Sequence, residues 1–152
     1  MLEVGTKVKD FNLKDGLGQT HKLSDYLGKK VVIYFYPEDD SPGCTTQACT
    51  FRDIEPELKN LNVALLGISP DSVESHQAFQ TKYGLPFTLL SDPNHEVATY
   101  FGAYGTKNMY GKMVVGIIRS TFILDEKGVI EKVFKRASAK TNAESVLAHL
   151  KG

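Results

Sequence analysis

Two cysteines, Cys44 and Cys49, are the residues of this 152-residue chain best suited to covalent chemistry. A single pair is too few for a disulfide-rich scaffold. In a reducing compartment, paired cysteines serve catalysis, redox chemistry or metal binding more often than structure. The four histidines are scattered, and none has metal-ligand spacing to the cysteines, so we expect no metal site. The pair therefore indicates thiol redox chemistry.

Cys44 follows a segment, residues 36–43, that joins a predicted buried strand to a predicted helix. In open α/β sheets, sites form in the loops beyond the carboxyl ends of strands. We expect Ser41 to be the N-cap of the helix and Pro42 its first residue. Cys44 then lies in the first helical turn, where the positive end of the helix dipole favours a thiolate.

The spacing of the two cysteines restricts how they can react with each other. Cys49 follows five positions after Cys44, which differs from the C-x-x-C of thioredoxin-like disulfide exchangers. On an intact helix the two Cα atoms would lie roughly 8.6 Å apart. A disulfide requires less than about 7 Å. The thiols can therefore bond only if the helix opens, which suits a cycle in which one sulfur reacts before the other.

Strand patterns alternate with helix patterns along the chain. Continuous apolar runs at 31–36 and 63–69 predict strands covered on both faces. Shorter strands are expected at 87–90 and 121–124, with 129–134 completing a hairpin across the turn 125–128. Near the N-terminus, 11–13 and 19–23 flank a glycine-rich turn and predict a small peripheral hairpin.

Apolar residues at spacings of three and four predict four helices, at 44–61, 71–83, 94–100 and 142–150. Pro56 is expected to kink or divide the first of them. No repeat or linker divides the chain, so we expect a single domain over residues 1–152. The predicted fold is an α/β sandwich with a mixed central sheet flanked by helices.

The composition excludes several classes of function. Eighteen basic and eighteen acidic residues give a net charge of zero, which argues against nucleic-acid binding and against a polybasic membrane-surface protein. No apolar run approaches the roughly 20 residues of a membrane helix. The N-terminus lacks the features of a signal peptide. We therefore expect the cytosol, or an organelle whose targeting segment has been removed.

The residues around Cys44 also resemble those of a known family. Pro37-x-x-x-Ser41-x-x-Cys44 is similar to the P-x-x-x-[T/S]-x-x-C motif of peroxiredoxins. Ser41-Pro-Gly-Cys-Thr45, with Cys49 after it, resembles the bacterioferritin-comigratory-protein branch, also called peroxiredoxin Q. Serine stands where threonine is commoner, which keeps the hydroxyl and loses a methyl group. The segments 10–25, 67–71 and 119–125 also resemble the family, so nearly the whole chain is covered.

The resemblance implies a thioredoxin-like fold and a thiol-dependent peroxidase. Cys44 would attack the terminal oxygen of a hydroperoxide and become a sulfenic acid. Cys49 would then attack that sulfur and form an intramolecular disulfide. A dithiol such as thioredoxin would reduce it, without metal, flavin or nucleotide. The branch favours a monomer, with a weak dimer as the alternative.

The peroxide also needs groups that hold it in line with the attacking sulfur. Near-complete ionisation of a thiol that is about 3% thiolate at neutral pH gains only about 30-fold. Donors must therefore stabilise charge on the departing oxygen. The resemblance assigns this role to the Ser41 hydroxyl, the backbone amides of Gly43 and Cys44, and the Arg119 guanidinium. Pro37 would pack over the loop and limit water.

Two further functions remain open from the sequence. A thiol–disulfide oxidoreductase that never meets peroxide is one, although the cysteine spacing speaks against it. A non-enzymatic redox sensor is the other. Near the site, we interpret the acidic run 38–40 as a solvated loop. The segment containing Tyr104, Met109 and Tyr110 either shapes the peroxide pocket or is an ordinary surface loop.

Overall fold

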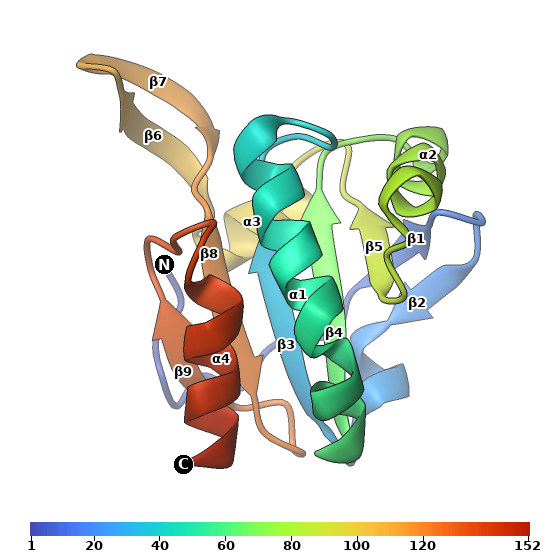
Figure 1. Ribbon diagram of the computed structural model, residues 1–152. Helices are drawn as coiled ribbons and strands as arrows, with labels where there is room; N and C mark the ends of the chain where they lie inside the picture. The colour runs from blue at the N-terminus through green and yellow to red at the C-terminus, as the bar shows by residue number, and fades with distance from the viewer.

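A seven-stranded mixed sheet forms the centre of the computed structural model, which describes residues 1–152 (Figure 1). The strand order is β2-β1-β5-β4-β3-β8-β9. Strands β3, β4 and β5 are parallel to one another, and the other neighbours pair antiparallel. The strands are β1 Asn12–Asp15, β2 Thr20–Lys22, β3 Lys30–Phe35, β4 Val63–Ser69, β5 Thr88–Ser91, β8 Ser120–Leu124 and β9 Ile130–Phe134.

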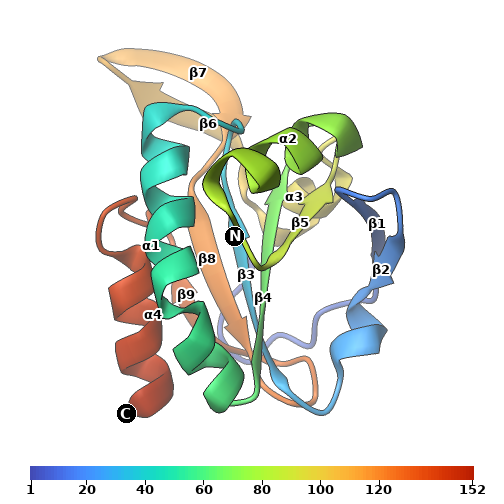
Figure 2. The same cartoon turned by 45° about the vertical axis from the view of Figure 1, so that its right-hand side comes forward.

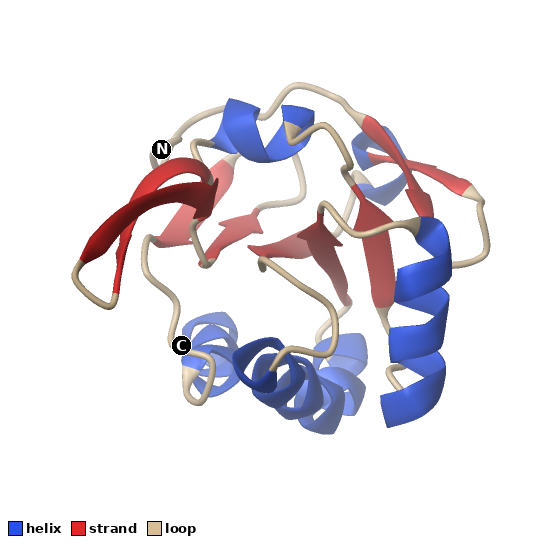
Figure 3. Cartoon of the chain, turned by 90° about the horizontal axis from the view of Figure 1, so that it is seen from above, coloured by secondary structure: helices blue, strands red, loops and turns tan.

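Helices cover both faces of this sheet. Helices α1 and α4 run side by side on one face (Figures 1 and 2), and α3 lies on the opposite face (Figure 3). None of the helices has the length and hydrophobicity that crossing a membrane requires. The helices are α1 Pro42–Asn60, α2 Val73–Tyr83, α3 Glu96–Phe101 and α4 Asn142–Lys151, with a short 3-10 helix at Leu23–Tyr26.

Strand β3 is buried from Val31 to Phe35 because it contributes to two cores. Tyr34 belongs to the core under α1 and α4, where its ring stacks on Phe51 with centroids 4.7 Å apart. Phe35 belongs to the core under α3, where its centroid lies 5.1 Å from that of Phe101. Alternate side chains of a strand point to opposite faces, so both faces of β3 require apolar residues.

The expected α/β architecture with a mixed central sheet is confirmed, and the predicted strands and helices agree with the structure to within two residues at each end. The N-terminal hairpin is peripheral, and it extends the sheet because β1 pairs with β5. Helix α2 begins at Val73 because the Ser72 hydroxyl accepts a hydrogen bond from Ser75 N at 3.1 Å. A serine N-cap of this kind sets the first turn.

Pro56 does not divide α1, which continues as one helix to Asn60. Of the two effects expected of Pro56, a kink or a division of the helix, division is therefore contradicted. Proline removes one backbone N–H, but Phe51 and Leu58 on either side of it remain buried in the same core. The packing of this apolar face outweighs the loss of one helical hydrogen bond.

A two-stranded arm, β6 Tyr104–Met109 and β7 Lys112–Ile117, stands where the sequence suggested a loop. It projects from the sheet at the end where α1 begins (Figure 1). Its turn residues Tyr110 and Gly111 have φ values of 53° and 80°, as a two-residue hairpin requires. Such hairpins are predicted from an Asn-Gly pair in the turn. Here tyrosine stands at the first turn position, so the sequence lacks that signal.

Gly67 in β4 makes the core beneath α1 sensitive to a single methyl group. A Cβ at this position would lie 2.7 Å from Leu89 Cδ2 and 2.9 Å from Tyr34 Cζ. We expect Gly67→Ala to lower the free energy of unfolding by about 1–3 kcal/mol, because the core is overpacked. Gly105→Ala in β6 is the control, since nothing lies within 4 Å of its Cβ position. Urea unfolding followed by circular dichroism measures both, and equal stability of the two variants would contradict the prediction.

Candidate active site

Cys44 lies in the first turn of α1, immediately beyond the carboxyl end of β3, and is 1% exposed. As predicted, Ser41 is the N-cap residue and Pro42 begins the helix. The Ser41 side chain does not cap the helix, however, because its hydroxyl donates to Glu38 O at 3.0 Å. The hydroxyl therefore presents its two lone pairs to a neighbour, and it acts as a donor there only after rotating.

Two backbone amides of the same turn remain free. Thr45 N donates to Ser41 O at 2.8 Å, whereas Gly43 N and Cys44 N donate to no protein acceptor. Unpaired amides at a helix start carry the positive end of the helix dipole. The thiol and the two donors thus share one helical turn, where the free amides can hold a negatively charged oxygen of a bound ligand.

Arg119, the residue just before β8, meets Cys44. Antiparallel pairing of Phe35 with Ser120 places Arg119 beside the loop that leads to α1. Its Nη2 donates to Cys44 Sγ at 3.3 Å. Gly43 leaves room for this approach, since a Cβ there would lie 3.2 Å from Nη2. The structure therefore brings together Cys44, Gly43 and Arg119, which the sequence analysis selected from distant segments.

The Arg119 guanidinium is held by a buried polar network that the sequence analysis missed. Arg119 Nη1 donates to Gln47 Oε1 at 2.6 Å, and Gln47 Nε2 donates to Asn142 Oδ1 at 3.1 Å. Thr121 Oγ1 also donates to Asn142 Oδ1, at 2.7 Å. Gln47, Asn142 and Thr121 are at most 2% exposed. The only sign in the sequence was a glutamine on the apolar face of the first helix.

The loop before Cys44 is anchored by Asp39, so the interpretation of residues 38–40 as a solvated run was wrong at this position. Asp39 is only 9% exposed. Its carboxylate accepts from Tyr36 OH at 2.6 Å and Ser75 Oγ at 2.8 Å, and lies 2.7 Å from His76 Nδ1. Asp39 N donates to Asp71 Oδ2 at 2.8 Å. These bonds fasten the loop to α2, and short-range sequence patterns do not reveal partners so distant along the chain.

The aromatic side chain of Tyr34 lies in the same buried core as Cys44. Tyr34 is 1% exposed, and its hydroxyl has no hydrogen-bond partner. Burial, together with negative charge at Cys44, raises the pKa of Tyr34 well above its usual value. Tyr34 therefore stays neutral and adds no second negative charge beside the sulfur.

Cys49 lies further along α1 and is half-buried. Both thiols are free, and the helix continues unbroken through both positions. The structure thus confirms that the two cysteines share one helix. The opening that a disulfide requires remains a prediction.

A cleft of about 400 Å³ opens beside Arg119. It lies between the arm and the segment that follows β9. Met109 lines it, whereas Tyr104 stacks on His95 at 4.3 Å and Tyr110 is fully exposed at the tip of the arm. The lining residues are Pro37, Thr106, Lys107, Asn108, Met109, Ile118, Arg119, Arg136 and Ala137.

The cleft concentrates positive charge. Lys107, Arg119 and Arg136 line it, and no acidic residue does. None of the three forms a salt bridge with a carboxylate. Burial, followed by the charge of Arg119, lowers the pKa of Lys107. Uncompensated cations around a partly apolar cleft favour a ligand that carries negative charge.

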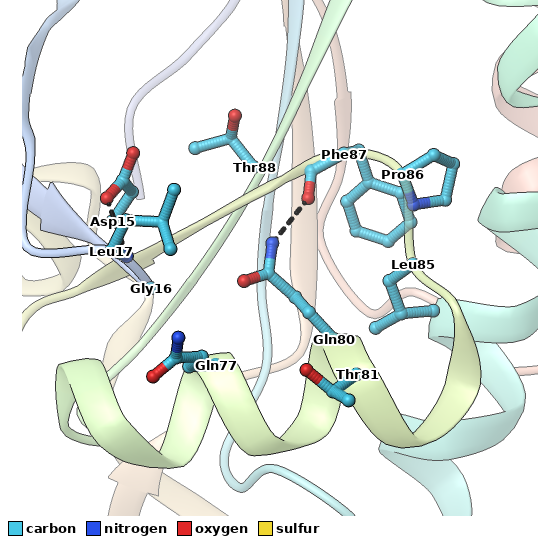
Figure 4. A pocket seen from close by; sticks show the side chains of 10 residues that line it. All are labelled: Asp15, Gly16, Leu17, Gln77, Gln80, Thr81, Leu85, Pro86, Phe87 and Thr88. Carbon is cyan, nitrogen blue, oxygen red and sulfur yellow. Dashed lines mark hydrogen bonds between the residues drawn. The ribbon is translucent and has the colours of Figure 1, made fainter.

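A second hollow, of about 430 Å³, lies between α2, the β1–β2 turn and the segment leading into β5 (Figure 4). Gln80 Nε2 donates to Phe87 O at 2.8 Å across it. The lining residues are Asp15, Gly16, Leu17, Gln77, Gln80, Thr81, Leu85, Pro86, Phe87 and Thr88. None of them belongs to the residues selected around Cys44, so this hollow is separate from the thiol chemistry.

Comparisons with known proteins agree with this geometry. The model of the AhpC/TSA family matches residues 4–133. The chain is 46% identical to a protein named putative peroxiredoxin bcp from Coxiella burnetii, over 98% of this chain and 99% of that protein. It is 44% identical to peroxiredoxin Bcp of Bacillus subtilis, over 99% and 96% of the two chains.

Solved structures show the same similarity. The bacterioferritin comigratory protein of Xanthomonas campestris, whose alkyl peroxide reduction activity was studied, superposes with a TM-score of 0.90 at 39% identity, covering 99% of this chain and 96% of that one. A cysteine-to-serine mutant of PrxQ from Xylella fastidiosa gives a TM-score of 0.93 at 33% identity, covering 99% and 96%.

Gly43 provides a direct test of the Arg119 contact. We expect Gly43→Ala to slow oxidation of Cys44 by hydrogen peroxide about fivefold, because the added methyl displaces Nη2 and weakens a charge-assisted hydrogen bond. Loss of free thiol in a rapid-quench time course measures the rate. Thr46→Ala is the control, since Thr46 is exposed on the adjoining turn. An unchanged rate in Gly43→Ala would show that the close approach of Arg119 does not matter.

Proposed function

Because this chain belongs to the AhpC/TSA family, with Bcp and PrxQ peroxiredoxins as close relatives, it is a thiol-dependent peroxidase, and we propose that Cys44 and Cys49 carry out its two oxidative steps. The contact between Arg119 Nη2 and Cys44 Sγ, at 3.3 Å, is the observation that supports this most directly. A fixed cation beside a thiol in a helical first turn stabilises both the thiolate and the oxygen it attacks.

In the first step, the Cys44 thiolate attacks the distal oxygen of a hydroperoxide. The S–O bond forms as the O–O bond breaks, and the departing oxygen leaves as water or an alcohol after taking a proton. Arg119 and the amides of Gly43 and Cys44 hold the peroxide and stabilise the charge on its departing oxygen. Ser41 accepts a hydrogen bond from the peroxide, since its own proton is donated to Glu38 O.

In the second step, the Cys49 thiolate attacks the sulfenic sulfur of Cys44. The S–S bond forms as the S–O bond breaks, and the departing hydroxide takes a proton and leaves as water. Because the two residues lie five positions apart in α1, the first turns of that helix unwind to bring the sulfurs together. Thioredoxin or a similar dithiol then supplies two electrons and two protons, which restores both thiols.

The proposed cycle uses two cysteines of one chain and a dithiol reductant. Cys44 and Cys49 lie in one helix of the same chain, so their disulfide needs no second subunit, and a monomer is the proposed working form. A reductant that keeps dithiols available is typical of the cytosol, which is the proposed location. Pro37 lines the cleft and limits the access of water to the sulfur.

The cleft favours organic hydroperoxides with a negatively charged group. Its apolar residues Met109 and Ile118 suit a carbon chain, and the cations Lys107 and Arg136 suit a carboxylate on that chain. Lys107 Nζ also donates to Ile117 O, so the carboxylate would share this ammonium with the backbone. Arg119 remains directed at Cys44. Hydrogen peroxide reaches the sulfur without using the outer part of the cleft.

The division of labour between the cysteines is tested by intact mass after one equivalent of hydrogen peroxide. We expect Cys44→Ser to remain unoxidised and to lose all turnover, because the attacking sulfur is gone. Cys49→Ser should consume one equivalent and stop as a sulfenic acid, since nothing resolves it. Thioredoxin-dependent turnover by Cys44→Ser would contradict the assignment. Reduction of insulin without consumption of peroxide would favour a disulfide exchanger instead.

The charge preference of the cleft is tested with two hydroperoxides that differ in charge. We expect Lys107→Ala and Arg136→Ala each to lower kcat/KM for a carboxylate-bearing hydroperoxide about three- to fivefold, as for a partly exposed ion pair. The value for neutral tert-butyl hydroperoxide should change less than twofold. Lys112→Ala is the control, because Lys112 is exposed outside the cleft. Equal losses for both substrates would contradict charge recognition.

A further inference from the structure

The buried network behind Arg119 ends on Asn142, the first residue of α4. We propose that Asn142 is a positioning residue that holds the reduced site closed: through Gln47 it orients Arg119 toward Cys44, and it restrains the helical segment that must open before Cys49 can react. This inference rests on the peroxidase function proposed above and extends it to a residue that touches neither sulfur nor peroxide.

The guanidinium of Arg119 determines which atoms of the network face each other, and Asn142 Nδ2 is left buried without a partner. A guanidinium can only donate hydrogen bonds, so Gln47 must present Oε1 to Arg119 Nη1. The Gln47 Nε2 donor then faces Asn142, which must present Oδ1. Thr121 Oγ1 donates to the same oxygen from β8. An acceptor at position 142 therefore fixes the orientation of Gln47, and Gln47 in turn fixes Arg119.

Arg119 depends on this support. Gln47 Oε1 is the only oxygen of the protein that accepts from its guanidinium, and Cys44 Sγ is its other partner. Without an acceptor at Asn142, the Gln47 Nε2 donor is left buried and unpaired in the closed arrangement. Leaving a buried donor unpaired is unfavourable by about one order of magnitude in an equilibrium constant. The closed arrangement would therefore weaken relative to an open one in which water satisfies Gln47.

The position of Gln47 connects the two steps of the cycle. Gln47 lies between Cys44 and Cys49 in α1, on the segment that must unwind. Its bond to Asn142 ties this segment to α4, and the bond must break before the disulfide forms. The same contact thus favours reaction with peroxide and opposes resolution. Loss of the contact should change the two rates in opposite directions.

Two variants of similar size separate the acceptor from the shape of the side chain. Asn142→Leu removes the acceptor, whereas Asn142→Asp retains an oxygen for Gln47 and Thr121. For Asn142→Leu we expect oxidation of Cys44 by hydrogen peroxide to slow about fivefold to tenfold, and Cys44–Cys49 disulfide formation to accelerate by a similar factor. Asn142→Asp should keep both rates within about twofold of wild type. Rapid quench with dimedone, followed by intact mass, measures both steps.

A variant that destabilises α4 without touching the network serves as the matched control. Leu150 packs against the same core from the other end of α4, away from the network. Leu150→Ala should lower the stability of the protein without moving the two rates in opposite directions. If Asn142→Leu behaves like Leu150→Ala, or if Asn142→Asp fails to restore the wild-type rates, the positioning role is wrong.

Hydrogen exchange on the reduced protein keeps this test independent of peroxidase activity. Asn142→Leu should accelerate amide exchange at residues 44–50 relative to wild type, whereas Leu150→Ala should leave that segment protected. Unchanged protection at 44–50 in Asn142→Leu would overturn the inference even in an active enzyme. Absence of peroxide consumption by the wild type would instead overturn the proposed function, with the exchange result still deciding the role of Asn142.

Discussion

A guanidinium held 3.3 Å from a buried sulfur is the interaction on which the rest of this site depends. A cation and a thiolate attract each other strongly away from water, but only when the fold holds both in place. The start of α1 fixes the sulfur of Cys44, and the pairing of β3 with β8 delivers Arg119. Gly43 provides the space between them. Strand pairing and helix initiation thus converge on one contact.

The closed site is held from two sides. Asp39 fastens the loop before α1 to α2 through bonds to Ser75 and His76. Gln47 fastens the first turns of α1 to α4 through Asn142. Both sets of bonds are buried, where hydrogen bonds are strong and unpaired groups are costly. The segment between the cysteines is therefore more firmly held than its threonine-rich sequence suggests.

The stability of this segment opposes the second step of the cycle, in which Cys49 attacks the oxidised Cys44. The site must be rigid enough to align peroxide. The same helix must nevertheless open so that Cys49 can reach Cys44. The balance is set by a few side-chain bonds, since each changes an opening equilibrium by about fivefold to tenfold. A sulfenic acid that waits too long for its partner is exposed to further oxidation by excess peroxide. The rate of disulfide formation and the protection of Cys44 against further oxidation therefore both depend on the stability of one helical segment.

The sequence by itself determined the local structure and the chemistry. Apolar runs and helical spacing located the sheet and its helices, and the motif from Pro37 to Cys44 identified the reactive thiol, because these signals depend on neighbours a few residues apart. Only the tertiary structure decided which distant segments lie beside them. It joined Gln47 to Asn142, buried Asp39 in a polar network and raised the β6–β7 arm beside the cleft. Partners this far apart along the chain leave no periodic trace in one sequence, since their contact exists only once the layers have packed.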